Sequence, residues 1–212
     1  MIATLLVILL RFIPPPTTSF MLQTALRNGP YAYRWQPYEQ ISPHMAIAVI
    51  ASEDQLFPKH SGFDLDAINQ ALRDSERGAG LRGASTITQQ VAKNLFLWPG
   101  RSLIRKGIEA YFTFLIELTW NKQRILEMYL NIAQFSDRTF GVEAASQRFF
   151  QISARDLSPQ EAALLAAVLP GPELYSLESP SWEVLDNQSW ILTQMDQLGG
   201  EAYLQQLYNK PQ

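Results

Sequence analysis

The chain has 212 residues, 47% of them hydrophobic, which is enough to bury the core of one domain. Its net charge of −3 argues against general polyanion binding, so nucleic acid is not an expected partner. The absence of cysteine excludes disulfide bonds and thiolate metal sites. The only two histidines, His44 and His60, disfavour a histidine-based metal centre.

The N-terminal residues are strongly apolar. Residues 1–13 end at a run of three prolines and are shorter than the roughly 20 residues that cross a bilayer. They also lack the charged start and small-residue cleavage site of a secretory signal. We expect the outer end of a membrane anchor whose beginning is missing from this sequence; the alternative is a short hydrophobic helix packed on the domain. Residues 14–40 are expected to form an irregular arm, and residues 41–212 the main domain.

The first predicted helix of the main domain ends in two acids. Ser42 followed by Pro43 is typical of a helix start. The apolar residues after them predict a helix over 45–52 that brings Glu53 and Asp54 to its end.

A second helix and a loop follow. Asp64 is expected to cap a helix that runs to about residue 75. Residues 76–83 hold three glycines and two arginines and are the best candidate for a mobile loop.

The most informative stretch comes next, because polar residues recur there at helical spacing. On a helix opened by Ser85 or Thr86, one side is polar and the opposite side is apolar. Most polar stripes are solvated outer faces, and that alternative stays open here. The polar side consists of Gln89, Gln90, Lys93 and Asn94, and the apolar side of Ile87, Val91 and Leu95.

Positive charge gathers beside this stripe. Residues 93–124 carry six basic and two acidic side chains, a local net charge of +4 in an acidic chain. Such a concentration on helical turns favours a local anion site. The basic residues are Lys93, Arg101, Arg105, Lys106, Lys122 and Arg124.

One acid in this segment, Glu109, lies one helical turn from Arg105 and Lys106. It forms either a surface ion pair or a charge held next to a bound phosphate or metal. Residues 96–98 are expected to form an exposed apolar turn suited to a lipid tail, with a place in the core as the alternative.

The rest of the chain also predicts helices. Residues 103–120 are the most hydrophobic long stretch and predict a buried helix, on which Glu109 is costly unless it is paired. No run alternates at period two, so the expected fold class is all-α. Further helices are expected over 122–134, 141–150, 159–169 and 180–198, the third of them opened by a capping box at Ser158.

Two carboxylates are candidates for proton transfer, Glu53 at the end of an apolar helix and Glu109 within one. Apolar surroundings disfavour a charged carboxylate, which suits such a group to take or give a proton near neutral pH. Glu53 and Asp54 are equally an ordinary pair of helix-end acids. Two carboxylates in a helical domain suggest glycoside chemistry, and the basic cluster favours a phosphorylated sugar.

Four ordered motifs between Ile41 and Leu177 resemble the peptidoglycan glycosyltransferases of glycosyltransferase family 51, most closely their monofunctional biosynthetic form. The motifs are Glu53-Asp54-x-x-Phe57-x-x-His60-x-Gly62-x-Asp64, Gly83-x-Ser85-Thr86-Ile87-Thr88-Gln89-Gln90, Arg105-Lys106-x-x-Glu109, and Arg124-Ile125-Leu126-Glu127-x-Tyr129-Leu130-Asn131.

The resemblance implies a lysozyme-like helical lobe with a smaller jaw that faces the membrane. It also implies that lipid II is polymerised into glycan with inversion at the donor sugar and release of undecaprenyl diphosphate, for bacterial cell-wall biosynthesis. The expected place is the outer, periplasmic face of the inner membrane. The expected partners are lipid II, the growing lipid-linked glycan and the membrane, with cell-division or elongation proteins as further candidates.

The resemblance also implies roles for single residues. Glu53 would be the general base that removes the proton from the acceptor 4-hydroxyl, and Lys93 and Arg101 would hold the departing diphosphate. Glu109 would organise the donor side directly or through a divalent cation, Mg²⁺ or Mn²⁺; the sequence leaves the need for a metal open. The other residues assigned to the substrate site are Ser85, Gln89, Gln90, Asn94, Arg105 and Lys106, and those assigned to its support are Asp54, Phe57, Glu127 and Asn131.

Two rival functions remain at this point. A lysozyme-like hydrolase or lytic transglycosylase would share the helical lobe and the glutamate, but it cleaves neutral glycosidic bonds and does not need the group of cations. A membrane-tethered helical module that recruits cell-wall enzymes would need neither.

Overall fold

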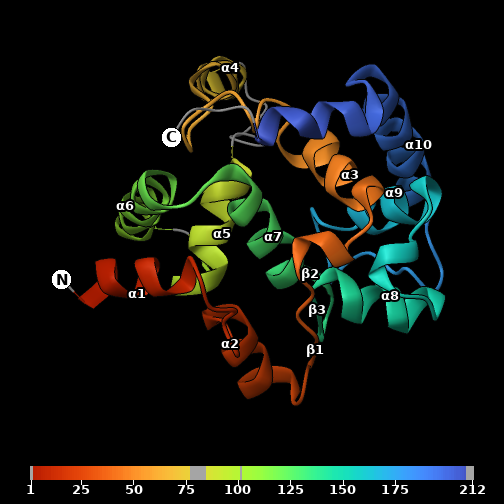
Figure 1. Cartoon of the computed structure of the whole chain (residues 1–212), viewed down its shortest axis with the longest axis horizontal. Helices are drawn as coiled ribbons and strands as arrows, with labels where there is room; N and C mark the ends of the chain where they lie inside the picture. The colour runs from red at the N-terminus through yellow and green to blue at the C-terminus, as the bar shows by residue number, and fades with distance from the viewer. Residues whose placement is uncertain (1, 77–84, 101, 209–212) are drawn as a thin grey trace.

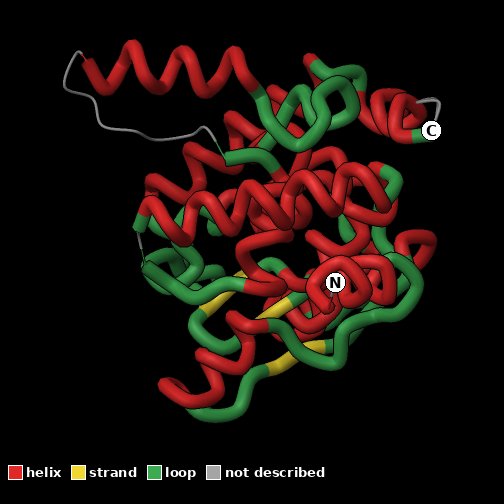
Figure 2. Tube along the Cα trace, turned by 90° about the vertical axis from the view of Figure 1, so that its left-hand side faces the viewer, coloured by secondary structure: helices red, strands yellow, loops and turns green. Residues whose placement is uncertain are grey.

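A computed structural model describes residues 2–76, 85–100 and 102–208. Helices dominate it, and one small sheet lies near their middle (Figures 1 and 2). The expected mobile loop falls, except for its first residue, outside the described residues. The mostly helical fold class is confirmed.

α5 (Ile87–Phe96) lies between two other helices. It contacts both α6 (Leu103–Thr119) and α7 (Lys122–Ile132), as Figure 1 shows. The apolar side of α5 is buried in the core that these helices share.

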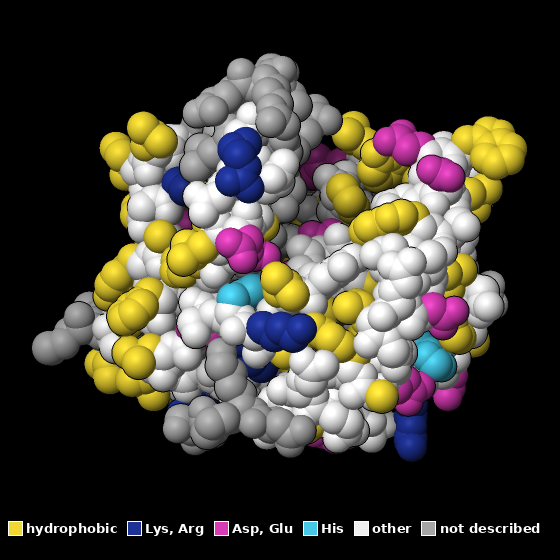
Figure 3. Space-filling model, turned by 90° about the horizontal axis from the view of Figure 1, so that it is seen from above, with side chains coloured by type: hydrophobic (Ala, Val, Ile, Leu, Met, Phe, Trp, Pro, Cys, Tyr) yellow, Lys and Arg dark blue, Asp and Glu magenta, His cyan; other side chains and the backbone are white. Residues whose placement is uncertain are grey.

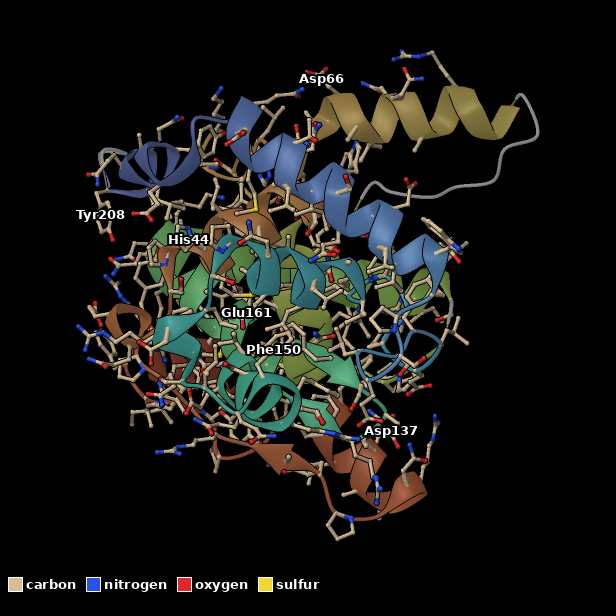
Figure 4. The ribbon with its side chains drawn as sticks, turned by 90° about the vertical axis from the view of Figure 1, so that its right-hand side faces the viewer. His44, Asp66, Asp137, Phe150, Glu161 and Tyr208 are labelled. Carbon is tan, nitrogen blue, oxygen red and sulfur yellow. The ribbon has the colours of Figure 1, made fainter. Side chains whose placement is uncertain are left out.

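A second group of helices surrounds α3 (Pro43–Glu53), whose residues from Met45 to Ala51 are all buried. α9 (Pro159–Ala167) and α10 (Trp182–Gln197) pack against it and against each other (Figure 4). η3 (Gly200–Leu207) closes the same side, where the Nδ1 atom of His44 lies 3.5 Å from Glu201. These contacts fix the end of α3, where Glu53 lies.

The sheet joins the arm to the main domain. Its strand order is β1-β3-β2, with β1 (Ala32–Tyr33) parallel and β2 (Gln134–Ser136) antiparallel to β3 (Thr139–Phe140). Strands of two or three residues are too short to show an alternating pattern, so the sequence did not predict them.

The remaining elements lie at the edges. α8 (Val142–Phe150) follows the sheet and contacts η2 (Ala154–Asp156), and η1 (Tyr38–Gln40) contacts α7. α4 (Leu65–Glu76) lies at the top of Figure 1, and the side chain of Asp64 caps its start as expected.

Local capping explains where the predicted helices begin. Ser42 accepts a hydrogen bond from the His44 N–H at the start of α3. α5 and α9 each begin with a capping box, in which a side-chain hydroxyl and the side chain three residues later satisfy two backbone N–H groups. The boxes are Thr86 with Gln89 and Ser158 with Glu161.

The expectation of an irregular arm over residues 14–40 is wrong for its first half, which forms α2 (Ser19–Asn28). The hydroxyl of Thr18 accepts a hydrogen bond from Met21 N, and Gly29, with a φ of 85°, ends the helix. A glycine in this conformation after a helix is a common stop signal. These two capping residues are the sequence signal for α2, and the prediction of an irregular arm overlooked them because it relied on the aromatic composition.

The expectation that residues 103–120 form a buried helix is half right. α6 exists, but it buries only one face, which includes Glu109 and Ile116. Leu103 is 92% exposed and Leu118 is 69% exposed. Apolar residues occur all round this helix, so hydrophobicity alone predicted complete burial, whereas α5 covers one side only.

The apolar N-terminus forms α1 (Ile2–Leu10), which contacts α6 and crosses it (Figures 1 and 2). Val7 and Leu10 are buried there, and the Trp120 indole N–H donates to Val7 O at 2.9 Å. The outer residues of α1, among them Leu5 and Leu9, remain exposed. Within the described part of the chain, no helix combines the length and the apolarity needed to span a bilayer.

The expected exposed turn over residues 96–98 is only partly exposed. Leu97 is buried, and the Phe96 ring stacks on the Phe112 ring with centroids 4.3 Å apart. Trp98 alone remains largely exposed.

Candidate active site

Glu53 is the last residue of α3, and its side chain is partly buried. Its Oε2 accepts a hydrogen bond of 2.6 Å from Gln90 Nε2. Burial raises the pKa of the Glu53 carboxyl, while the Gln90 hydrogen bond and the charge of Lys93 oppose this rise. The group is therefore suited to take up a proton nearer neutral pH than an ordinary glutamate.

Gln90 is held in turn by Tyr129. The buried Tyr129 hydroxyl donates to Gln90 Oε1 at 3.3 Å, which leaves the amide NH₂ of Gln90 to face Glu53. Burial raises the pKa of Tyr129 well above its ordinary value, so its hydroxyl remains a donor. α3, α5 and α7 thus meet in a chain of side-chain hydrogen bonds.

Asp54 has a different task from its neighbour Glu53. Its Oδ2 accepts from Ile87 N at 2.9 Å and its Oδ1 lies 2.8 Å from His60 Nε2. Because Gly62 N donates to His60 Nδ1, the imidazole carries its proton on Nε2 and donates to Asp54. Asp54 therefore joins the end of α3 to the first turn of α5.

The polar stripe of α5 is not a solvated face, so that alternative is wrong. Gln89 and Asn94 are buried, and Gln90 and Lys93 are partly buried. Gln89 completes the capping box of α5 and so holds the helix start, whereas the other three line a cavity.

Two cavities lie on either side of Gln90. The Lys93 cavity, about 410 Å³, is lined by Gln90, Lys93 and Asn94 of α5, by α2, by Tyr129 and by residues 169–174. The Glu53 cavity, about 160 Å³, is lined by Glu53, Asp54, Asp64 and Ser85, among others. Since Gln90 borders the first cavity and bonds to the acid of the second, its side chain lies between them.

Lys93 is available to a ligand. Among the described residues, its ammonium group makes no hydrogen bond or ion pair, and its Nζ lies 5.7 Å from the centre of the Phe20 ring. Burial lowers the pKa of Lys93, while Glu109 and Glu53 act to raise it. A partly buried cation without a direct partner favours an anion in this cavity.

Glu109 is 3% exposed and paired on both oxygens. Arg105 Nη1 lies 3.0 Å from Oε2, and Lys106 Nζ donates to Oε1. The ion-pair expectation is confirmed, although the pair is buried rather than on the surface. This donor set does not fit a divalent cation, because both oxygens already face cations. The described part of the chain contains no group of three His, Asp or Glu side chains that could hold a metal.

The basic cluster does not act as one unit. Lys122 pairs with Glu117 in the core, and its Nζ lies 4.4 Å above the ring of the buried supporting residue Phe57. Arg124 pairs with Glu127. Arg101 lies outside the described residues.

Glu127 and Asn131 hold the arm rather than the cavities. Glu127 Oε1 accepts from Tyr38 N, and the Asn131 amide exchanges two hydrogen bonds with the backbone of Gln36. Their predicted supporting role is therefore to attach residues 36–38 to α7.

Sequence reasoning missed three residues that line the cavities. Tyr129 lay inside a quoted motif but received no role. Arg27 of α2 and Trp190 of α10 line the Lys93 and Glu53 cavities, respectively. Nothing in the sequence relates Trp190 to Glu53, because packing of α10 on α3 alone brings them together.

In this helical domain a partly buried glutamate lines one cavity, and a lysine without a direct partner among the described residues lines another. These are the parts of an enzyme for glycosyl transfer. Comparison with known proteins leads to the same class. Residues 22–196 match the family model described as Transglycosylase.

Similar proteins carry the name biosynthetic peptidoglycan transglycosylase. The chain is 52% identical to that of Pseudomonas fluorescens Pf-5, with 97% of this chain and 88% of the relative covered. It is 53% identical to that of Pseudomonas putida F1 (95% and 88% covered) and 50% identical to that of Xylella fastidiosa 9a5c (96% and 87% covered). The chain belongs to the transglycosylase family, which confirms the resemblance carried by the four motifs.

Replacing Gln90 with leucine tests the electrostatic setting of Glu53. The Gln90 amide stabilises the charged carboxylate, so its loss should raise the pKa of Glu53 further. The titration is followed through the carboxyl ¹³C shift of Glu53 by NMR. Gln188→Leu, at an amide that donates to Gln160 O on α9 instead, is the control and should leave that pKa unchanged. An unchanged pKa in Gln90→Leu would contradict the assigned hydrogen bond.

Proposed function

We propose that this transglycosylase polymerises lipid II into peptidoglycan strands, with Glu53 as the general base and Lys93 as a ligand of the leaving diphosphate. The observation that carries the proposal is the hydrogen bond by which Gln90, which lines the Lys93 cavity, binds Glu53, which lines the other cavity; among the described residues, Lys93 has no hydrogen-bond or ion-pair partner. A hydrolase acting on neutral glycan has no use for a partly buried lysine without a partner.

The charges that line the two cavities support the binding of the donor in one and of the acceptor in the other. The Lys93 cavity also includes Arg27, which makes no ion pair among the described residues. Its described lining thus carries two cations against one acid, Glu173, so it suits the diphosphate of a donor. None of the described residues that line the Glu53 cavity is a cation, so it suits the neutral sugar of an acceptor.

The reaction follows from this placement. Glu53 takes the proton of the acceptor 4-hydroxyl, and the oxygen attacks C1 of the donor sugar from the side opposite the diphosphate. The bond from C1 to the diphosphate oxygen breaks, and its electron pair leaves with the diphosphate, whose negative charge Lys93 and the proposed ligand Arg101 stabilise. Attack from the opposite side inverts the configuration at C1.

We also propose that α1 and α6 rest on a lipid surface, with the catalytic domain on the periplasmic face of the bacterial inner membrane. These neighbouring helices leave an apolar surface exposed, consisting of Leu5, Leu6, Ile8, Leu9, Leu103, Ile104, Phe114 and Leu118. Large exposed apolar patches mark interaction sites, and a lipid-linked substrate must be reached at the membrane.

Replacing Glu53 with glutamine tests the general base. The amide keeps the shape but cannot accept the proton, so coupling of lipid II should fall by roughly 10²- to 10⁴-fold with the fold intact. Polymer formation from lipid II is measured by gel electrophoresis, and folding by circular dichroism. Near-normal coupling in Glu53→Gln would exclude this role, and wild-type protein that fragments finished glycan but does not couple lipid II would support a hydrolase instead.

Replacing Lys93 with methionine tests the anion site. Loss of the cation should slow coupling by roughly 10²- to 10³-fold. The melting temperature should not fall, because a partly buried charge without a partner costs stability. Lys59→Met, at an exposed lysine that lines neither cavity, is the control. Wild-type coupling in Lys93→Met would refute the diphosphate role.

Sedimentation with anionic liposomes tests the membrane surface. Serine at Leu103, Ile104 and Leu118 together should lower the partition coefficient by roughly ten-fold or more, because each leucine or isoleucine contributes apolar area. Leu185→Ser, at an exposed leucine of α10, is the control. Equal sedimentation of the triple variant and the wild-type protein would contradict the proposed orientation.

A further inference from the structure

Trp190 lies between the Glu53 cavity and a second cavity. The indole is 47% exposed on α10 and lines the Glu53 cavity together with Ser85. It also lines the α10 cavity, about 300 Å³, whose other lining residues include Tyr175, Glu183 and Asp186. Among the described residues it makes no hydrogen bond, ring contact or cation contact. Its N–H and part of its ring surface are therefore open to a ligand.

The position of Trp190 is fixed by its own helix. Ile191 and Met195 bury the inner side of α10. On the neighbouring turns, Asn187 Nδ2 donates to Ala167 O at 3.0 Å, and Gln194 Oε1 accepts from Gln55 Nε2 at 2.9 Å. Gln55 is two residues beyond Glu53, so the turn that follows Trp190 is anchored directly to the end of α3. The stretch of helix that carries the indole is therefore anchored on both sides, which limits the backbone ordering that ligand binding requires.

The polar groups around Trp190 indicate which ligand fits. The described lining of both cavities contains carboxylates, hydroxyls and amides but no cation, unlike the Lys93 cavity. Figure 3 shows the molecule from above, with acidic, hydrophobic and basic side chains on that face. A sugar ring matches the indole and these polar groups, because its C–H face packs on an aromatic ring while its hydroxyls donate to carboxylates. An anionic ligand would be repelled by the same acids.

We propose that Trp190 is the platform on which the acceptor sugar stacks while its 4-hydroxyl faces Glu53, and that the α10 cavity receives the adjoining part of the same acceptor. The inference rests on the proposed function. It adds a substrate-binding residue from outside the four motifs, and it assigns the α10 cavity to the adjoining sugar of that acceptor.

Kinetics of three variants test the platform. The first coupling is measured with a donor lipid whose terminal 4-hydroxyl is blocked, so that added lipid II must serve as the acceptor. Trp190→Ala should raise the KM for the acceptor roughly ten-fold with a much smaller change in kcat, because it removes a stacking contact. Trp190→Phe should retain most of the affinity because the aromatic face remains. Trp182→Ala, at an 87% exposed tryptophan of the same helix that lines neither cavity, should behave as wild type.

An NMR titration tests the same contact without turnover. N,N′-diacetylchitobiose is added to wild-type protein, and the five indole N–H signals are followed, with Trp190 assigned through Trp190→Phe. The Trp190 signal should move and the Trp182 signal should not.

The outcomes separate the two proposals. Wild-type coupling with an unchanged KM in Trp190→Ala, or equal effects in Trp190→Ala and Trp182→Ala, would overturn the platform alone. A stationary Trp190 indole signal would do the same, even where Trp190→Ala fails to fold. Wild-type protein that cannot couple lipid II would instead contradict the proposed function, while the titration still decides whether Trp190 binds a sugar.

Discussion

The junction between the end of α3 and the start of α5 is the constraint on which the site depends. Asp54 accepts the first backbone N–H of α5 and is held by His60, and the Thr86 hydroxyl that caps α5 donates to Gly62 O at 2.7 Å. A carboxylate at a helix N-terminus also interacts favourably with the helix dipole. With this end of α5 fixed, Gln90, one turn further, faces Glu53. Shortening or rotating α5 would move both Gln90 and Lys93 away from Glu53.

Burial shifts the pKa values of Glu53 and Lys93 in opposite directions, and each charge opposes the shift of the other. A direct ion pair would satisfy both groups and leave neither for the substrate. The intervening Gln90, oriented by Tyr129, occupies the carboxylate through a neutral donor. The acid can therefore accept a proton and the lysine can bind an anion. Their opposite charges still stabilise each other without a direct ion pair. The oxygens of Glu109 pair with Arg105 and Lys106, so Glu109 adds negative charge near Lys93 but forms no ion pair with it.

Local signals predicted much of the fold, and long-range packing decided the rest. Helix starts at Ser42, Thr86 and Ser158 follow from hydrogen bonds between near neighbours, which the sequence displays directly. The exposed face of α6 could not be predicted in this way, because its apolar residues do not reveal which of them the rest of the protein covers. The Glu53 cavity was predicted only as far as its motif residues. The contact of α10 with α3 that adds Trp190 is set by side chains with no common pattern in the chain.

Polar residues of the fourth motif hold neighbouring segments in place and do not line the cavities. Arg124 pairs with Glu127, lies 5.0 Å from the Trp35 ring, and donates to the carbonyl oxygens of Leu10 and Ile13 just after α1. A guanidinium group can satisfy all these partners at once because its donors are spread in a rigid plane. α7 therefore carries Tyr129 towards the cavities on one side and holds α1 and the arm on another. Because α1 also contacts α6, the hydrogen bonds from α7 to the end of α1 help to position the exposed apolar surface. In the proposed membrane orientation, a constant arrangement would matter, because the diphosphate of the substrate would lie at a fixed depth while its sugars must reach the acid. That orientation would give a role to the arginine, glutamate and asparagine of the fourth motif, which line neither cavity.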